Sequence, residues 1–225
     1  AAADPLVERG IRNVVILGNG VAGTTFAEHL RRASPGCRID IVTRESHHFY
    51  NRMALGRAIA GRSGIERLQL LPPEWAERHD ITVWLGTLAR HIDPDRKIVH
   101  LGTGETLSYD KLVLATGAAA RHPDLPGADL PGAFVLREAD HALQLRRWLQ
   151  GVENRDALVI GGGVLGVETA GILAGLGHRT ILIERGDRLM GQHLDRKGAA
   201  ILARFLASRG IDVRLNASLA QLEGS

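Results

Sequence analysis

Two glycine-rich segments, GNGVAG and GGGVLG, have the GxGxxG spacing that suits the pyrophosphate of a dinucleotide. Glycines at this spacing leave no Cβ in the path of the anion, and the first N–H groups of a following helix point toward it. The expected contact residues are Gly18, Gly20, Val21, Ala22 and Gly23 in the first segment, and Gly161, Gly163, Val164, Leu165 and Gly166 in the second. We therefore predict two dinucleotide sites, the alternative being a glycine-rich packing turn.

An acidic residue at the end of the next strand would complete each site by accepting the hydroxyls of the adenosine ribose. In the second site this residue is Glu184, 18 residues after Gly166. Its charge would repel a 2′-phosphate and so favours NADH over NADPH, a preference that the adjacent Arg185 weakens. In the first site the equivalent position is Thr43, and the nearest acid is Glu45, which either reaches the ribose from the loop or is a solvated loop charge.

Two βαβ units must position these residues, one over 13–43 and one over 157–184. Each begins with a short β-branched strand, turns on the glycines, continues as a helix with apolar residues near i, i+3, i+4 and i+7, and ends in a second strand. Between the units, alternating apolar residues predict a β-meander that leads into a buried strand over 111–115. The predicted meander strands are 81–85, 89–92, 97–101 and 107–115.

A stretch rich in proline and glycine, HPDLPGADLPGA, predicts a linker, and we place the domain boundary after residue 122. Beyond it we expect strands at 134–136 and 212–215 and helices at 138–150 and 195–208, in addition to the second βαβ unit. The predicted fold class is α/β, with two Rossmann-like dinucleotide-binding domains in series and a β-meander in the first.

Composition excludes several other classes of protein. The net charge of +3 is small and the charges are not clustered, so no nucleic-acid partner is expected. The single cysteine, Cys37, cannot form an internal disulfide or a two-cysteine redox or metal site, which favours the reducing cytoplasm. The apolar run 157–177 contains Glu168, so no membrane span is expected, and no histidine spacing indicates a metal site.

Five segments together resemble the FAD-dependent pyridine nucleotide-disulfide oxidoreductases: GNGVAG, HFYNRMALGR, LSYDKLVLATGAAAR, GGGVLGVETA and ILIERGDRLM. Within that family, the chain is most similar to ferredoxin and rubredoxin reductases and to the flavin-binding N-terminal region of assimilatory NADH nitrite reductase. The resemblance implies that residues 1–122 form an incomplete FAD-binding domain. It implies that residues 123–225 form an NAD(P)H-binding domain, incomplete at its C-terminal end.

The resemblance also implies roles for residues of the FAD site. The first glycine turn would hold the FAD pyrophosphate, with Ala115, Thr116 and Gly117 close to the flavin nucleotide and Arg121 touching FAD. Ala89 would meet the adenine through its backbone, although ordinary strand packing explains this residue equally well.

The family pattern YxRxxLSK appears here as YNRMALGR. Arg52 is retained, Arg57 stands where a lysine near the flavin is usual, and Gly56 replaces a serine. An arginine can supply the same positive charge, with a different geometry of donors. Glu168 matches a glutamate near the nicotinamide and the flavin edge, and as a carboxylate on the apolar face of a helix that we expect to be buried it needs a partner.

These residues predict an FAD-dependent NAD(P)H oxidoreductase that passes hydride from NADH to FAD and electrons on to a ferredoxin, a rubredoxin or an attached metal centre. Hydride transfer between stacked rings requires no acid or base, so no catalytic side chain is assigned. Two alternatives remain: the flavin module of an assimilatory nitrite reductase, and a non-catalytic nucleotide-binding or assembly subunit. Full-length relatives return to the flavin domain with a second FAD motif, so a partner subunit or a further C-terminal region would complete the flavin site.

Overall fold

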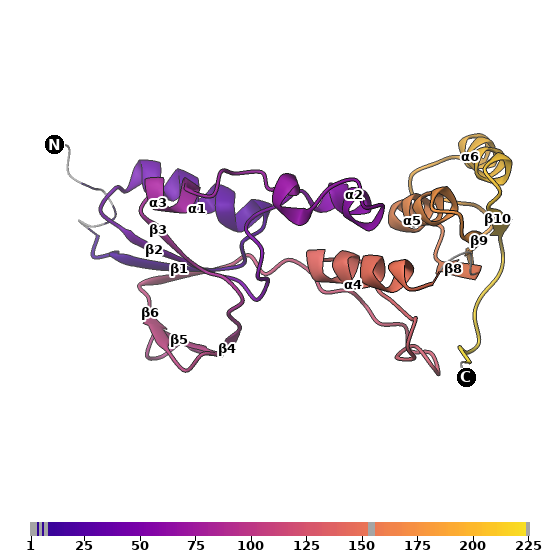
Figure 1. Ribbon diagram of the computed structural model, residues 1–225. Coiled ribbons are helices and arrows are strands. Elements are labelled where there is room, and N and C mark those ends of the chain that lie inside the picture. The colour runs from indigo at the N-terminus through magenta and orange to yellow at the C-terminus, as the bar shows by residue number, and fades with distance from the viewer. Residues whose placement is uncertain (1–3, 5, 7–8, 153–155, 224–225) are drawn as a thin grey trace. The chain divides into compact units, whose positions relative to one another are not determined.

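The computed structural model describes residues 4, 6, 9–152 and 156–223 (Figure 1). The chain forms two compact units, one of Ala1–Asn51 with Ile65–Ala118 and one of Arg52–Gly64 with Ala119–Ser225. The segment Arg52–Gly64 thus belongs to the second unit, although it precedes much of the first unit in the sequence.

A four-stranded parallel sheet forms the centre of the first unit, with the strand order β3-β2-β1-β7. Its strands are β1 (Asn13–Leu17), β2 (Arg38–Val42), β3 (Ile81–Trp84) and β7 (Lys111–Leu114). Helix α1 (Val21–Ala33) connects β1 to β2, and the shorter helices η2 (Ile65–Leu68) and α3 (Trp75–Arg78) precede β3. The first βαβ unit is therefore present, as its spacing predicts.

Alternate residues of β1 pack on opposite faces of this sheet, which explains why the strand reads as a continuous apolar run. Val14 and Ile16 pack with α1 and α3, whereas Val15 and Leu17 pack against the second, smaller sheet. That sheet is the antiparallel meander of β4 (Ala89–Asp93), β5 (Ile98–Leu101) and β6 (Thr106–Ser108), on the side of the parallel sheet opposite α1 in Figure 1.

Two predictions about these strands are wrong. The segment 81–85, predicted as part of the meander, is β3 of the parallel sheet and pairs with β2, because alternation of apolar residues reports which faces are buried and not which strand is the partner. Strand β7 was expected to be buried, but it lies at the edge of the sheet and Leu114 is 67% exposed.

The second unit contains a three-stranded parallel sheet with the order β10-β9-β8. Its elements are η1 (Arg52–Ala54), α2 (Leu55–Ile59), α4 (Ala139–Gln150), β8 (Asp156–Ile160), α5 (Val164–Gly175), β9 (Arg179–Ile183), α6 (Arg196–Ser208) and β10 (Asp212–Arg214). Val159 and Leu182 of the sheet pack with α5 and α6, and α2 packs against α4 and α5. This is the second predicted Rossmann-like unit.

The predicted strand at 134–136 is not formed. The ring of Phe134 instead packs edge-on against Trp148 of α4, with 5.7 Å between the ring centroids. The pattern of apolar residues there reflects contact with a helix and not pairing with a strand. Among the described residues, none of the helices has the length and apolar character needed to span a membrane.

Candidate functional site

The three glycines of the first turn, Gly18, Gly20 and Gly23, meet three different surroundings. Gly18 has a positive φ of 115°, and a Cβ there would lie 2.1 Å from the carbonyl oxygen of Ala115. A Cβ at Gly23 would lie 2.0 Å from the carbonyl oxygen of Gly18, so α1 can approach β1 only because residue 23 is a glycine. Gly20, by contrast, faces open space. The outer glycines thus permit the turn and the packing, and the middle one leaves an open approach to the backbone.

The second turn repeats this division of roles. Gly161 has a φ of 104° and its N–H donates to the carbonyl oxygen of Ile183 at 2.8 Å. A Cβ at Gly166 would lie 1.8 Å from the carbonyl oxygen of Gly161, whereas Gly163 faces open space. Packing within the protein therefore explains the third glycine, whereas the middle one leaves an open approach to the backbone.

Both turns leave helix N-terminal N–H groups available to an anion. The N-cap residues of α1 and α5 are Gly20 and Gly163, and neither helix start receives a side-chain cap in the described structure. The residue after each cap is exposed, Val21 at 68% and Val164 at 39%. Four N–H groups at a helix start have no intrahelical partner, and the helix dipole favours negative charge there, so a pyrophosphate fits each turn.

Glu184 is held beside the second turn by two backbone N–H groups. Gly162 donates to its Oε2 and Gly186 donates to its Oε1, each at 2.7 Å. The side chain is half-buried at the end of β9. Each carboxylate oxygen can accept further hydrogen bonds, so the group is oriented and still able to receive ribose hydroxyls.

Gly162 is a site residue that the sequence reasoning did not select. A Cβ there would lie 2.6 Å from Cδ2 of Leu189 and 3.0 Å from Cβ of Glu184. Leu189 is fully buried and the next residue, Met190, donates its N–H to the Gly162 carbonyl at 2.8 Å. The run of three glycines in GGGVLG was the available signal, since the GxGxxG spacing requires only two of them.

Glu45 lies in the loop after β2 and is bonded to a tyrosine. The hydroxyl of Tyr50 donates to Glu45 Oε2 at 2.6 Å, and the backbone N–H of Glu45 donates to Oγ1 of Thr43 at 3.3 Å. The backbone of Gly86 donates to the Glu45 carbonyl at 2.9 Å, which ties this loop to the end of β3. The Tyr50 partner was not anticipated from the sequence.

The other residues expected in the first site follow strands of the first unit. Ala115 donates its N–H to the carbonyl of Leu17 at 2.8 Å, which continues the pairing of β7 with β1 and brings the ATG segment beside the first glycine turn. Thr116 and Gly117 are exposed, and Gly117 has a positive φ of 68°. Ala89 begins β4, half-buried, opposite Leu101.

Three predicted arginines belong to the second unit. Arg52 is half-buried and its Nη1 donates to the carbonyl of Arg137 at 3.4 Å. Arg57, on α2, and Arg121 are both exposed. All three can present a positive charge to a ligand.

Glu168 lies on α5 of the second unit and is exposed, not buried as its apolar helix suggested. The helix α5 packs one side on the sheet and leaves other apolar residues in solvent, so an apolar sequence does not bury every position. Glu168 contacts Gly56 of α2: a Cβ at Gly56 would lie 2.6 Å from Glu168 Oε1.

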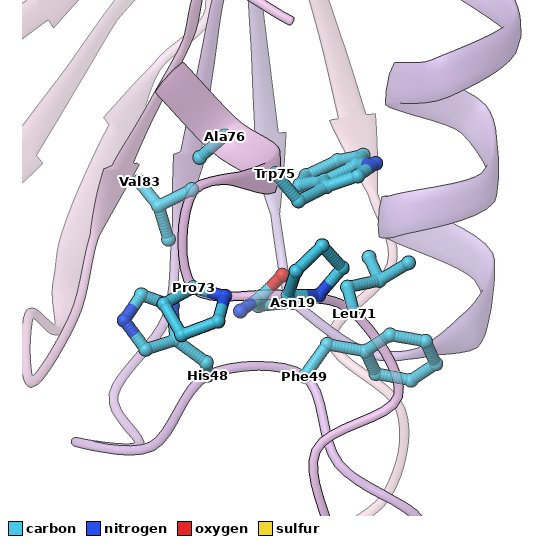
Figure 2. A pocket seen from close by; sticks show the side chains of 9 residues that line it. Asn19, His48, Phe49, Leu71, Pro73, Trp75, Ala76 and Val83 are labelled. Atoms are coloured by element: carbon cyan, nitrogen blue, oxygen red, sulfur yellow. The ribbon is translucent and has the colours of Figure 1, made fainter. Parts of the chain in front are cut away.

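A small pocket opens beside the first turn (Figure 2). Its lining residues are Asn19, His48, Phe49, Leu71, Pro72, Pro73, Trp75, Ala76 and Val83. Asn19 is part of the turn itself and accepts a hydrogen bond from Oγ1 of Thr24 at 3.1 Å. The sequence reasoning did not predict this pocket, because its walls come from segments far apart in the chain.

Two observations concern the remaining reactive groups. Burial raises the pKa of the Cys37 thiol, so the thiol stays protonated and hydrogen-bonds to the carbonyl of Ile11 at 3.3 Å. Within the part of the chain that the structure describes, no three His, Cys, Asp or Glu residues gather in a way that would hold a metal ion.

Comparisons with known proteins agree with this arrangement. The family model described as pyridine nucleotide-disulphide oxidoreductase matches residues 12–225. The rubredoxin-NAD(+) reductase of Pseudomonas putida is 35% identical over 94% of this chain and 54% of its own length. The large subunit of nitrite reductase (NADH) from Escherichia coli (strain K12) is 33% identical over 89% of this chain and 24% of its own.

Among solved structures, the putidaredoxin reductase–putidaredoxin complex matches with a TM-score of 0.82 and 30% identity, over 95% of this chain and 52% of that one. The chain spans about half the length of the first curated reductases that it matches. The family match covers both glycine turns and the segments that pack against them. The chain therefore belongs to the pyridine nucleotide-disulphide oxidoreductase family.

Proposed function

We propose that this chain is part of an FAD-dependent NAD(P)H oxidoreductase, with FAD in the first unit and NADH in the second. When bound, FAD supplies hydride acceptance from the nicotinamide and release of electrons to a redox acceptor. The observation that carries the proposal is the open middle glycine of each turn beside a third glycine packed on backbone. Two such turns in one chain provide two sites for dinucleotides.

The protein's own residues bind and orient the two cofactors. The N–H groups at the starts of α1 and α5 hold the two pyrophosphates, and Glu45 and Glu184 accept ribose hydroxyls. The family resemblance assigns Arg52, Arg57 and Arg121 to the flavin nucleotide as sources of positive charge, and Ala115, Thr116 and Gly117 let the backbone approach it. Ala89 contacts the adenine through its backbone. In this proposed reaction no side chain donates or accepts a proton.

Glu184 supports NADH as the preferred nicotinamide cofactor. Its carboxylate is fixed next to the turn by Gly162 and Gly186, so a 2′-phosphate would meet a negative charge that cannot easily move away. We place the division between the FAD and NADH domains near residue 122, with the segment Arg52–Gly64 packed in the second unit. The single cysteine supports a cytoplasmic location.

The electron acceptor is proposed to be a redox protein of the ferredoxin or rubredoxin type or an attached metal centre. The names of the similar reductases support the first choice, and the similar nitrite reductase subunit supports the second. In the second case the chain is the flavin module of a larger nitrite reductase. Since the chain spans about half the length of the curated reductases that it matches, we propose in either case that residues outside it, from the same protein or from a partner subunit, contribute to the flavin site.

An absorbance spectrum of the purified chain, taken before and after anaerobic NADH, tests the proposal. A flavin spectrum that bleaches with NADH is the expected result. Added ferredoxin or rubredoxin should then restore the colour if a small redox protein is the acceptor. A colourless chain that does not take up added FAD would contradict the proposal for this chain alone and favour a non-catalytic nucleotide-binding or assembly subunit.

A further inference from the structure

Tyr50 is a buried tyrosine of the first unit whose hydroxyl bonds to a carboxylate. Only 5% of Tyr50 is exposed, and its hydroxyl donates to Oε2 of Glu45 at 2.6 Å. A hydrogen bond to an ionised carboxylate is stronger than one between neutral groups. A glutamate side chain has several rotamers to choose from, so this bond narrows where the Glu45 carboxylate lies.

The backbone at Tyr50 is itself held in place by the segment that precedes α3. The N–H of Asn51 donates to the carbonyl oxygen of Leu68 at 2.8 Å. Tyr50 also pairs with Gln69 in an isolated antiparallel bridge. The phenol ring is therefore anchored by its backbone and by its burial, and it provides a fixed point against which the Glu45 side chain is bonded.

Glu45 lies at the edge of the parallel sheet that also carries the first glycine turn. Gly18 donates its N–H to the carbonyl oxygen of Val42 at 2.8 Å, so the turn after β1 begins beside the end of β2, three residues before Glu45. The loop after β2 then returns to the turn, because His48 lines the same pocket as Asn19 (Figure 2). Ligands of open parallel sheets bind outside the carboxyl ends of the strands, which is this edge.

The nearest acid of the first site stands two residues later than the spacing expects. Thr43 occupies the expected position, is buried, and accepts the N–H of Glu45 with its Oγ1 at 3.3 Å. Glu45 is half-buried, so part of its surface stays open to a ligand. Each carboxylate oxygen can accept more than one hydrogen bond, so the bond from Tyr50 leaves acceptor capacity for a further donor.

We propose that Tyr50 is a positioning residue that holds Glu45 ready to accept the 2′-hydroxyl of the adenosine ribose of FAD, in place of an acid at position 43. The hydrogen bond fixes the carboxylate before the ligand arrives, so binding does not have to order a flexible side chain. The inference deepens the proposed function and rests on it, since it requires FAD in the first unit.

The substitution Tyr50→Phe tests this role, and the readout is a ratio of two affinities. The probes are FAD and its analogue with 2′-deoxyadenosine, each titrated by flavin fluorescence into the full chain after any bound flavin has been removed. The wild type should bind FAD roughly tenfold more tightly than the deoxy analogue, because only FAD donates a hydroxyl to the charged acceptor. Tyr50→Phe should lower that ratio to roughly threefold, since the ligand must then order Glu45 itself.

Tyr109→Phe is the matched control. It removes the same hydroxyl from the other tyrosine of the chain, which packs against the core between the two sheets of the same unit. Glu45→Ala and the double variant Glu45→Ala/Tyr50→Phe complete a cycle in which the double variant should match Glu45→Ala. The unfolding temperature is measured for every variant. A general loosening of the unit weakens both flavins by the same factor and leaves their ratio unchanged.

The possible outcomes separate the inference from the proposed function. An unchanged ratio in Tyr50→Phe, or an equal reduction with and without Glu45, would overturn the inference and leave the proposed function standing. A wild type that binds both flavins equally well contradicts the inference too, because Glu45 then does not accept the 2′-hydroxyl. A wild type that binds neither flavin contradicts the proposed function for this chain together with the inference.

Discussion

At the residue scale, each glycine turn contains one glycine that close packing requires and one that leaves the backbone open to a ligand. Gly23 and Gly166 contact backbone carbonyls so closely that no larger residue fits, and this requirement is satisfied within the protein. A Cβ at Gly20 or Gly163 would meet no protein atom, so these positions leave room for a ligand to approach the backbone. Substitutions should therefore separate folding from binding at positions three residues apart.

Gly20→Ala should lower retention of FAD and leave the fold intact, because its Cβ points into the approach of the pyrophosphate. Gly163→Ala should lower affinity for NADH in the same way, and each variant is the control for the other ligand. Flavin absorbance and NADH titration measure the two effects. Gly23→Ala should instead destabilise the first unit by about 3 kcal/mol, since its Cβ overlaps the Gly18 carbonyl oxygen. Equal effects of Gly20→Ala on both ligands would contradict the assignment.

Glu184→Gln should weaken NADH binding by roughly tenfold and narrow the preference over NADPH. The amide keeps the size of the side chain but removes the negative charge, and hydrogen bonds to a charged group contribute about 1.5–3 kcal/mol. Glu105→Gln is the control, because Glu105 is an exposed residue between β5 and β6. Binding constants for both cofactors measure the change. If the ratio of the NADH and NADPH binding constants is unchanged, Glu184 does not distinguish a ribose hydroxyl from a 2′-phosphate.

At the scale of elements, one carboxylate connects the starts of two neighbouring strands. Asp110 precedes β7, and its Oδ2 accepts the N–H of Arg12 at 2.7 Å and that of Asn13, in β1, at 2.8 Å. These two backbone hydrogen bonds hold the pKa of Asp110 below its usual value. The contact helps to set the alignment in which β7 brings Ala115 to Gly18.

Asp110→Asn should therefore lower the stability of the first unit by about 1 kcal/mol at neutral pH, allowing for solvent screening. A depressed pKa in the folded state contributes stability above the unfolded pKa of about 3.9, and that contribution is lost as the pH falls through the folded value. The difference between wild type and variant should thus shrink in acid. Denaturant unfolding at neutral pH and at a pH below the lowered pKa measures it, and a constant difference would contradict the argument.

At the scale of the whole molecule, each unit has its own buried core and its own glycine turn. A ligand that binds only the folded form of one unit stabilises that unit, and the stabilisation grows with the logarithm of the ratio of ligand concentration to dissociation constant. The stability of each unit, measured with and without each ligand, therefore tests the proposed assignment of FAD to the first unit and NADH to the second.

Ile41→Ala should lower the stability of the first unit by about 3 kcal/mol, because Ile41 is completely buried between the parallel sheet and α1. Hydrogen exchange followed by mass spectrometry locates the loss. We expect faster exchange in β1, β2 and β7, reversal by FAD, and little change in β8 and β9. Equal loss of protection in β8 and β9 would show that the two units unfold as one.

The local sequence was sufficient to predict both βαβ units and both glycine turns, whereas the ribose-binding roles of Glu45 and Glu184 stay predictions. Strand, turn and helix formation depend on residues within about 30 positions, and the GxGxxG spacing is local. The family resemblance was also available, because it is carried by short segments such as YNRMALGR. The predictions for β3 and for residues 134–136 were wrong, because an apolar pattern alone does not identify which strand or helix packs against a segment.

Contacts between distant segments decided the rest. Nothing in the spacing brings Gly56 to Glu168, Gly162 to Leu189, or Tyr50 to Glu45, because each contact depends on how separate elements pack. The exposure of Glu168 and Leu114 likewise follows from which faces other elements cover. Side-chain periodicity reports that a residue can be buried, whereas only the packed structure determines which neighbour buries it.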